Sequence, residues 1–277
     1  MFRCVRSDAI RGGSAAFAVR SKTLYISRRR AYIRDMADHS AIEWTEATWN
    51  PTSGCTKVSP GCDRCYAERM ALRFPKTFPK GFELTLRPDA LELPLRWRRP
   101  RTIFVNSMSD LFHVDVPDAY IAQVFGVMAR TPQHTYQVLT KRAERLARLA
   151  PRLPWPSNVW MGVSVESPKY RWRIDCLRKT SAAIRFISAE PLLAALPDLN
   201  LDGIHWLIAG GESQPGARAA DTDWFEDLRD QCGRAGVAFF LKQLGGHPSK
   251  RGGDKALLDG RRWIQLPVKV QPALASA

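Results

Sequence analysis

Three cysteines lie within eleven residues of this 277-residue chain, at Cys55, Cys62 and Cys65. Their spacing is C-x6-C-x2-C, and the loop that carries them also holds Gly54 and Pro60. Because thiolate sulfur is a soft ligand, three thiols on one loop indicate either a zinc site or an iron–sulfur cluster. Six cysteines in 277 residues are too few for a disulfide scaffold, so we expect the clustered thiols to bind metal.

The missing fourth ligand separates the two kinds of metal site. A structural zinc ion takes four protein ligands, so a zinc site here would need one from elsewhere in the chain. The candidates for that ligand are Cys176, Cys232, His113 and His247. Cys176 and Cys232 fall in the middle of predicted helices, where a cysteine is more often a small core residue. By contrast, a 4Fe-4S cluster on three thiolates leaves one iron open, which is the arrangement that radical enzymes use to bind S-adenosylmethionine.

Polar side chains also follow each predicted strand of a parallel α/β fold, where ligand sites gather. We predict that eight residues at these strand ends contact a cofactor or substrate: Asn106, Asp110, Lys141, Glu166, Glu190, Gly210, Gly211 and Glu212. The two glycines would let the backbone approach a ligand closely. Asp110 could instead cap a local turn. Lys242, at the end of the last predicted strand, could bind a ligand or could simply be a solvated ammonium group.

The elements that would position these residues are short apolar strands alternating with amphipathic helices. Strands are predicted at 103–107, 136–140, 159–165, 184–188, 205–210 and 237–242, with a short one at 47–50. Helix start signals follow at Pro117, Thr140, Ser167 and Asp221. We expect a strand followed by a helix six times, which predicts an α/β fold: a partial or complete TIM-type barrel of six to seven βα units. A doubly wound sheet is the main alternative.

Charge and composition divide the chain further. Residues 1–35 hold nine Lys and Arg against two acidic residues, a balance of +7 out of the total of +15. We interpret 1–35 as a basic extension, 36–243 as the barrel domain, and 244–277 as an appendage with an Asp259-Gly260 turn. The remaining charge of +8 is compatible with a nucleic-acid partner. Neither a membrane-spanning stretch nor a secretory leader is evident, so we expect a soluble, cytoplasmic protein that does not bind membranes.

Several motifs occur in the order of a known family. IEWTEATWNPTSGCTKVSPGCDRCYAERM, IFVNSMSDLFH, YQVLTKRAERL, NVWMGVSVE, ISAEPL, IAGGES and FFLKQLGG resemble the three-Cys-motif phage proteins, a radical-SAM-like family of unknown substrate. The resemblance runs from about residue 36, which it favours as the natural start, to about 267. It implies a partial TIM-type barrel, a 4Fe-4S cluster on Cys55, Cys62 and Cys65, and S-adenosylmethionine at the strand ends. The first cysteine gap is six residues, where radical-SAM enzymes usually have three.

The sequence thus predicts a radical-SAM-type enzyme with an unknown, nucleic-acid-related substrate and an external electron donor. In this hypothesis one electron cleaves S-adenosylmethionine, and the resulting 5′-deoxyadenosyl radical abstracts hydrogen from the substrate. Trp49 and Tyr66 would shield the cluster or simply pack. The alternatives are a zinc-stapled nucleic-acid-binding protein without catalytic activity and an electron-transfer or sensing protein.

Overall fold

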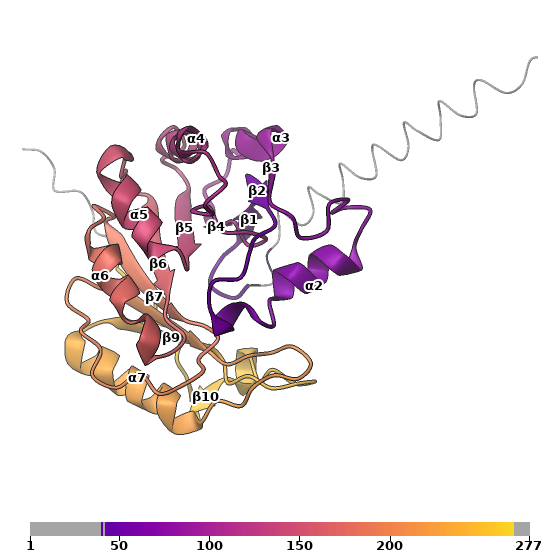
Figure 1. The fold of residues 1–277 in the computed structure, drawn as a ribbon. Coiled ribbons are helices and arrows are strands. Elements are labelled where there is room, and N and C mark those ends of the chain that lie inside the picture. The colour runs from indigo at the N-terminus through magenta and orange to yellow at the C-terminus, as the bar shows by residue number, and fades with distance from the viewer. Residues whose placement is uncertain (1–39, 41, 269–277) are drawn as a thin grey trace, which may run out of the picture.

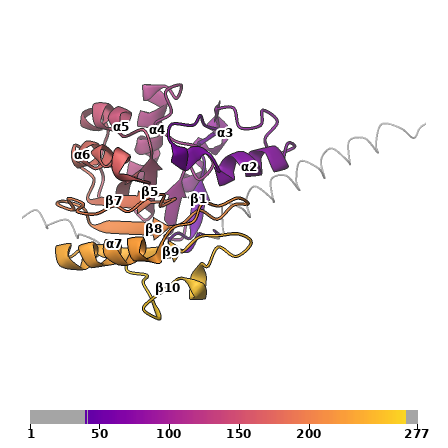
Figure 2. The same ribbon diagram turned by 60° about the horizontal axis from the view of Figure 1, so that its bottom comes forward.

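The computed structural model describes residue 40 and residues 42–268. Their main element is a seven-stranded sheet in which every neighbouring pair is parallel. In spatial order the strands are β1 (Ala47–Trp49), β4 (Thr102–Val105), β5 (Thr135–Thr140), β6 (Val159–Ser164), β7 (Ile184–Ala189), β8 (Trp206–Gly210) and β9 (Ala238–Gln243). The sheet curls into a half-barrel that leaves β1 and β9 unpaired with each other (Figures 1 and 2). The fold is therefore a partial TIM-like barrel, and the doubly wound alternative was wrong.

Helices cover the convex face of the sheet (Figure 1). They are α4 (Asp118–Ala129), α5 (Ala143–Leu149), α6 (Trp172–Arg178) and α7 (Thr222–Ala235), with the short 3-10 turns η3 (Ala150–Arg152) and η4 (Pro168–Tyr170). Helix α7 begins after Asp221 and ends at Gly236, whose φ of 66° is a left-handed conformation that glycine adopts without strain. The predicted strands and helix starts are confirmed to within about two residues, except that the start at Ser167 gives η4 first and α6 begins only at Trp172.

Two of the six predicted units are wrong, because no α-helix follows β9 in the described chain and none lies on the connection from β7 to β8. Pro191 and Pro197 interrupt the connection, and the residues between them are too few for a stable helix. The backbone N–H and C=O groups of this irregular connection still need hydrogen-bond partners. The Gln231 side chain of α7 supplies two of them, since it accepts from the N–H of Leu199 and donates to the carbonyl of Leu196.

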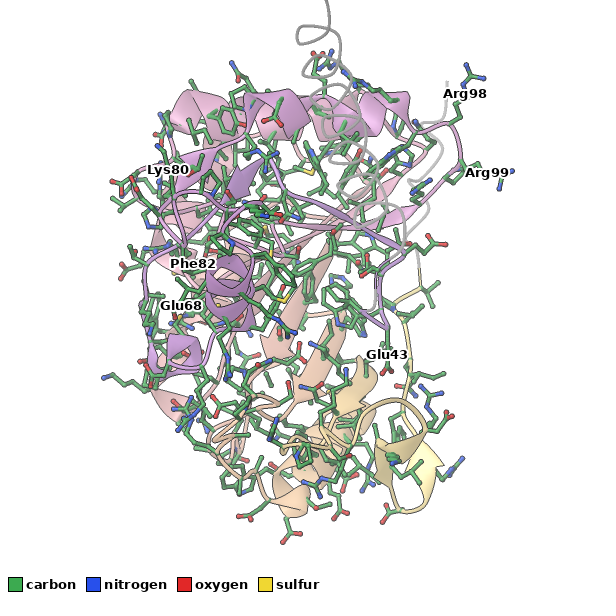
Figure 3. The ribbon with its side chains drawn as sticks, turned by 90° about the vertical axis from the view of Figure 1, so that its right-hand side faces the viewer. Glu43, Glu68, Lys80, Phe82, Arg98 and Arg99 are labelled. Atoms are coloured by element: carbon green, nitrogen blue, oxygen red, sulfur yellow. The ribbon has the colours of Figure 1, made fainter. Side chains whose placement is uncertain are left out.

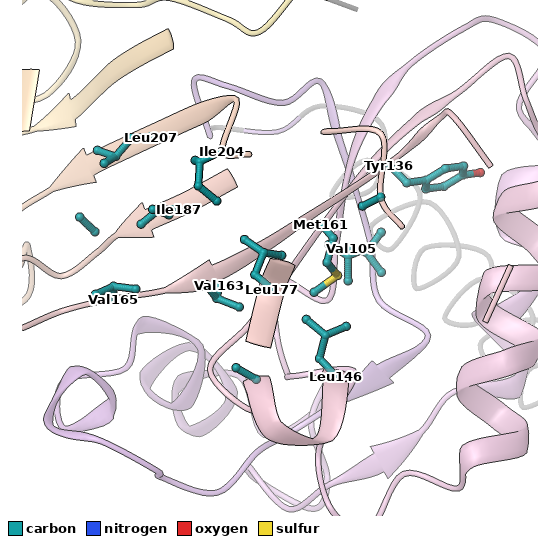
Figure 4. Packing of buried hydrophobic residues seen from close by; sticks show 14 of the residues in the cluster. Val105, Tyr136, Leu146, Met161, Val163, Val165, Leu177, Ile187, Ile204 and Leu207 are labelled. Carbon is teal, nitrogen blue, oxygen red and sulfur yellow. The ribbon is translucent and has the colours of Figure 1, made fainter. Parts of the chain in front are cut away.

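Side chains alternate between the two faces of each strand, and the two faces have different cores. The convex face packs on the helices through aliphatic residues such as Val105, Met161 and Leu207 (Figure 4). The concave face carries an aromatic cluster at the amino ends of the strands, which we call the inner aromatic cluster: Trp44, Phe104, Trp160, Phe186, Trp206 and Phe240. Trp206 lies against four of the others, with ring centroids 5.6–6.1 Å apart. This cluster fills the amino-terminal half of the barrel and leaves the opposite end to polar residues.

The described part of the C-terminal appendage, residues 244–268, covers the free edge of β9. It contains η5 (Gly253–Lys255), β10 (Leu257–Leu258) and β11 (Arg261–Arg262), and the last two pair across the predicted Asp259-Gly260 turn. Ile264 and Gly252 each form an antiparallel bridge to β9. Glu43, which Figure 3 places on the side of the molecule near the C-terminal segments, accepts the N–H of Gly253. The segment before β1 thus links the two open edges of the half-barrel.

A long excursion between β1 and β4 carries the cysteines. It consists of β2 (Thr52–Ser53), η1 (Pro60–Cys62), α2 (Tyr66–Arg73), β3 (Thr85–Leu86), α3 (Pro88–Leu91) and η2 (Leu93–Arg96), and β2 pairs with β3. The basic segment 1–35 and the alternative start at residue 36 lie outside the described residues. None of the helices in the described part of the chain combines the length and the apolar character that crossing a bilayer requires.

Candidate functional site

The carboxyl ends of the strands surround a cavity of 410 Å³ on the concave face. Every second residue of a strand lies on the same face of the sheet. Asn106 therefore shares the concave face with Phe104, and Glu190 shares it with Phe186, but both lie nearer the carboxyl ends of the strands. Six of the eight residues predicted to contact a ligand line the cavity: Asn106, Asp110, Lys141, Glu190, Gly211 and Glu212. The other two, Glu166 and Gly210, lie beside it without lining it.

All three clustered cysteines line the same cavity as free thiols. They lie on residues 54–65, which we call the cysteine loop. The loop starts at Gly54, where φ is +82° and an added Cβ would lie 2.1 Å from the carbonyl oxygen of Glu83. It ends at Cys65, the residue that precedes the first turn of α2. In the part of the chain that the structure describes, no three His, Cys, Asp or Glu side chains gather as tightly as a single metal ion requires.

Cys55 has a polar environment of its own. Its sulfur accepts a hydrogen bond from Nη2 of Arg142 over 3.7 Å, and the same nitrogen donates to the carbonyl and hydroxyl oxygens of Thr56. Burial and the nearby Asp110 carboxylate raise the pKa of Cys55 to about 11, in spite of the Arg142 guanidinium. Metal binding at Cys55 must therefore displace a proton.

Asn106 lines the cavity and has a buried acceptor atom. The residue is 4% exposed and has a φ of 62°, and its Nδ2 donates to Thr52 Oγ1 over 2.6 Å. The hydroxyl of Ser109 donates to the Thr52 carbonyl, so the Thr52 hydroxyl donates to Ser109 and its oxygen is left to accept from Asn106. This chain of donors fixes the amide orientation. Asn106 Oδ1 then has no partner among the described residues.

Asp110 and Lys141 hold neighbouring strand ends together. The Asp110 carboxylate accepts from the backbone N–H groups of Phe112 and Lys141 and from the hydroxyl of Thr140. It therefore caps a turn, the alternative that the sequence left open. Lys141 Nζ donates to Ser164 Oγ over 3.0 Å, and no carboxylate lies within ion-pair distance of it among the residues described.

Glu166 and Glu190 follow the carboxyl ends of β6 and β7, but their surroundings differ. Glu166 is 0% exposed and forms an ion pair of 2.8 Å with Arg173, which is 2% exposed. Glu190 lines the cavity, pairs with Lys242 Nζ at 3.0 Å and accepts from the Ser188 hydroxyl. A Cβ added at Gly210 would lie 2.5 Å from a Glu190 oxygen, so that glycine leaves room for the carboxylate.

Glu212 fastens the cysteine loop to the end of β8. Both of its oxygens accept from Arg218, and one also accepts from Arg64 of the loop. Arg218 donates in addition to the carbonyl of Pro60 and pairs with Asp63. Burial alone would raise the pKa of Glu212, but the hydrogen bonds from Arg218 and the charges of Arg218 and Arg64 hold it below its ordinary value. The neighbouring Gly211 admits the Leu244 carbonyl, which would lie 2.3 Å from an added Cβ.

Three further candidates, Cys176, Cys232 and Trp49, lie outside the cavity. Cys232 is buried in the core, where burial raises its pKa to about 12, and Cys176 is a half-buried residue against the same core. Trp49 is fully buried and donates to the Ala90 carbonyl, so it is a packing residue. Tyr66, by contrast, lines the cavity beside Cys65.

Sequence reasoning missed three arginines of the site: Arg64, Arg142 and Arg218. Each acts between segments that are far apart in the chain, and no spacing or periodic pattern marks such contacts. The only available signal was their position, because Arg64 stands within the cysteine spacing and Arg142 directly follows a strand end.

Comparisons with known proteins identify a family. A family model described as "Protein of unknown function (DUF5131)" matches residues 39–267. No protein of curated function matches the chain.

Solved structures of spore photoproduct lyase resemble the fold at low identity. One, a double mutant with bound AdoMet and dinucleoside spore photoproduct, has a TM-score of 0.45 at 12% identity and covers 73% of this chain and 65% of its own. A second, complexed with dinucleoside spore photoproduct, has a TM-score of 0.42 at 13% identity, with coverage of 66% and 62%. A cysteine-to-serine mutant gives 0.44 at 12%, with coverage of 74% and 58%. This chain thus spans less than two thirds of each of these proteins.

Proposed function

The chain belongs to the DUF5131 family, whose function is unknown, and we propose that it is an iron–sulfur enzyme of the radical S-adenosylmethionine type. The observation that carries the proposal is the meeting of three free thiols with a polar cavity at the open end of a half-barrel. This agrees with the resemblance of its motifs to the three-Cys-motif phage proteins.

The donor set fits a cluster with one iron left open. Three thiols of one loop supply three sulfur ligands, and they face a cavity whose size suits a small molecule. Cys176 and Cys232 belong to the helical layer and do not line that cavity. When bound, a 4Fe-4S cluster supplies single electrons to S-adenosylmethionine at its open iron.

The chain's own polar groups would orient the ligand. Asn106 Oδ1 is a buried acceptor without a partner in the described chain, and leaving such an atom unpaired is unfavourable, so it favours a ligand that brings an N–H or O–H donor. Lys141 is a cation of the cavity that no described carboxylate neutralises, so it favours a carboxylate or phosphate. S-adenosylmethionine carries both kinds of group.

Glu166, Glu212 and the two glycines take positioning roles in this proposal. Arg173 and Arg218 already pair with the two carboxylates, and the Glu190 carboxylate and the Leu244 carbonyl occupy the space beside Gly210 and Gly211. They hold the strand ends and the cysteine loop in place around the ligand.

The substrate in this proposal is related to nucleic acid, and its support is the charge of the chain. Outside residues 1–35 the sequence retains a balance of +8, which would attract a phosphate-rich partner. A cytoplasmic location and an external one-electron donor complete the proposal.

Metal analysis of matched cysteine variants tests the cluster. We expect anaerobic reconstitution with iron and sulfide to give about four irons per chain in the wild type. Cys62→Ala should lose the bound iron and the visible absorption, whereas Cys176→Ala should keep both. Stoichiometric zinc without a visible band would favour a zinc-stapled binding protein instead.

Cofactor cleavage tests the enzyme. With dithionite as reductant, the reconstituted wild type should convert S-adenosylmethionine to methionine and 5′-deoxyadenosine, and Cys62→Ala should not. An intact cofactor after prolonged reduction of a fully loaded protein would point to an electron carrier.

A further inference from the structure

The three cysteines differ in the donors that reach their sulfurs. Cys55 Sγ accepts from the Arg142 guanidinium over 3.7 Å, and Cys62 Sγ has a neutral neighbour, Ser59 Oγ, at 3.9 Å. Of the three sulfurs, Cys55 alone has a cationic hydrogen-bond donor among the described residues. The first thiol of the cysteine loop therefore differs from the other two in the charge of its hydrogen-bond donor.

Arg142 is held in place from several sides. Its Nη2 donates over 2.9 Å to both the carbonyl and the hydroxyl oxygen of Thr56, and its backbone N–H donates to Thr140 Oγ1. The Thr56 hydroxyl oxygen lies 2.8 Å from Nε2 of the buried His113. Because Asp115 N–H donates to Nδ1 of His113, the ring proton lies on Nε2 and points to Thr56. Thr56 thus fixes the guanidinium beside Cys55.

The charge of Arg142 is not neutralised by an acid. No carboxylate lies within ion-pair distance of it in the described chain, and its Nε is buried without a partner there. The guanidinium therefore places an un-neutralised positive charge and an unused donor beside Cys55, which lines the cavity. A buried donor of this kind favours an additional acceptor, such as sulfide sulfur.

We propose that Arg142 is a positioning residue that orients Cys55 and raises the reduction potential of the iron–sulfur centre. This inference rests on the proposed function. Reduction adds one electron, taken from an external low-potential donor, and so adds one negative charge next to the guanidinium. Hydrogen bonds and cations near the sulfurs stabilise the reduced form relative to the oxidised one. Arg142 therefore eases the uptake of that electron, and Thr56 and His113 hold Arg142 where it acts.

Potentiometric titration of the reconstituted protein, followed by EPR, tests the inference without measuring activity. Arg142→Gln keeps a hydrogen-bond donor but loses the charge. At the wild-type midpoint potential we expect its ratio of reduced to oxidised protein to fall about tenfold, which for one electron is 59 mV. Arg148→Gln removes the same charge from an exposed position on α5, and its ratio should stay within about twofold of the wild type.

Two further variants separate a specific effect from a damaged loop. Arg142→Lys keeps the charge and should shift the potential less than Arg142→Gln. Thr56→Val removes the hydroxyl that fixes the guanidinium, and we expect a smaller shift in the same direction. Equal potentials for Arg142→Gln and Arg148→Gln, with iron content as in the wild type, would overturn the role of Arg142 and leave the proposed function intact. A wild type that binds no iron–sulfur cluster would overturn both.

Discussion

The two halves of the concave face have opposite characters. At the amino ends of the strands, the inner aromatic cluster fills the barrel with rings in contact. At the carboxyl ends, the same strands surround a cavity lined by Asn106 and Lys141. Among the described residues, Asn106 Oδ1 has no hydrogen-bond partner and no carboxylate pairs with Lys141. The concave face is therefore packed in one half and open to ligands in the other, so substitutions in the two halves should affect different measurements.

The largest effect on stability should come from the closed half. Trp206→Ala removes a fully buried ring that contacts four aromatic neighbours, and we expect the free energy of unfolding to fall by about 3–5 kcal/mol. Denaturant unfolding of the metal-free protein measures this. A loss below about 1 kcal/mol would mean that this half is not the packed base of the barrel.

A buried ion pair lies beside the cavity, beyond the carboxyl end of β6. Arg173→Met leaves the fully buried Glu166 without its cation, and we expect a loss of about 3 kcal/mol, since an uncompensated buried charge is unfavourable. Adding Glu166→Leu should restore much of that loss, because the double variant has no buried charge. If the double variant is as unstable as Arg173→Met, the loss does not come from the unpaired carboxylate.

Substitution of the cavity residue Asn106 should change ligand affinity and leave the free energy of unfolding nearly unchanged. Asn106→Gly removes the cavity acceptor and the Thr52 bond, but glycine suits the φ of 62°, so the free energy of unfolding should change by less than about 1 kcal/mol. Affinity for S-adenosylmethionine, measured by calorimetry on the reconstituted protein, should fall about tenfold for a lost hydrogen bond. Unchanged affinity would remove Asn106 from the ligand site.

The smallest effect concerns the contact between Glu212 and the cysteine loop. Because the pKa of Glu212 is lowered in the folded protein, its ionised form stabilises the fold above the ordinary glutamate pKa. That contribution should disappear as the pH falls through the lowered pKa. Thermal unfolding of the metal-free wild type and of Glu212→Gln should therefore differ near neutral pH and converge in acid. A difference that grows as the pH falls would contradict the assignment.

Most of the fold could be predicted from the sequence because strands and helices leave periodic signals. Strands β5 and β7 were found to within one residue, since continuous apolar runs mark strands covered on both faces. The connection from β7 to β8 was not found. Its order depends on Gln231 of α7, a contact that no local pattern encodes.

The site was predictable in position but not in detail. Alternation along the strands brought Asn106, Lys141 and Glu190 to the cavity as expected. It could not indicate that Arg173 and Arg218 already engage Glu166 and Glu212, because those partners come from other segments. The pairing of these side chains depends on the path of the loops, and loop sequences have no periodic hydrophobic pattern from which that path could be predicted.

Mössbauer spectroscopy of the reconstituted wild type, before and after addition of S-adenosylmethionine, tests the central claim most directly. We expect a four-iron cluster in which one iron changes its spectrum when the ligand is added, because that iron has no protein thiolate. A zinc-loaded protein, or a cluster whose four irons are all unaffected by the ligand, would contradict it.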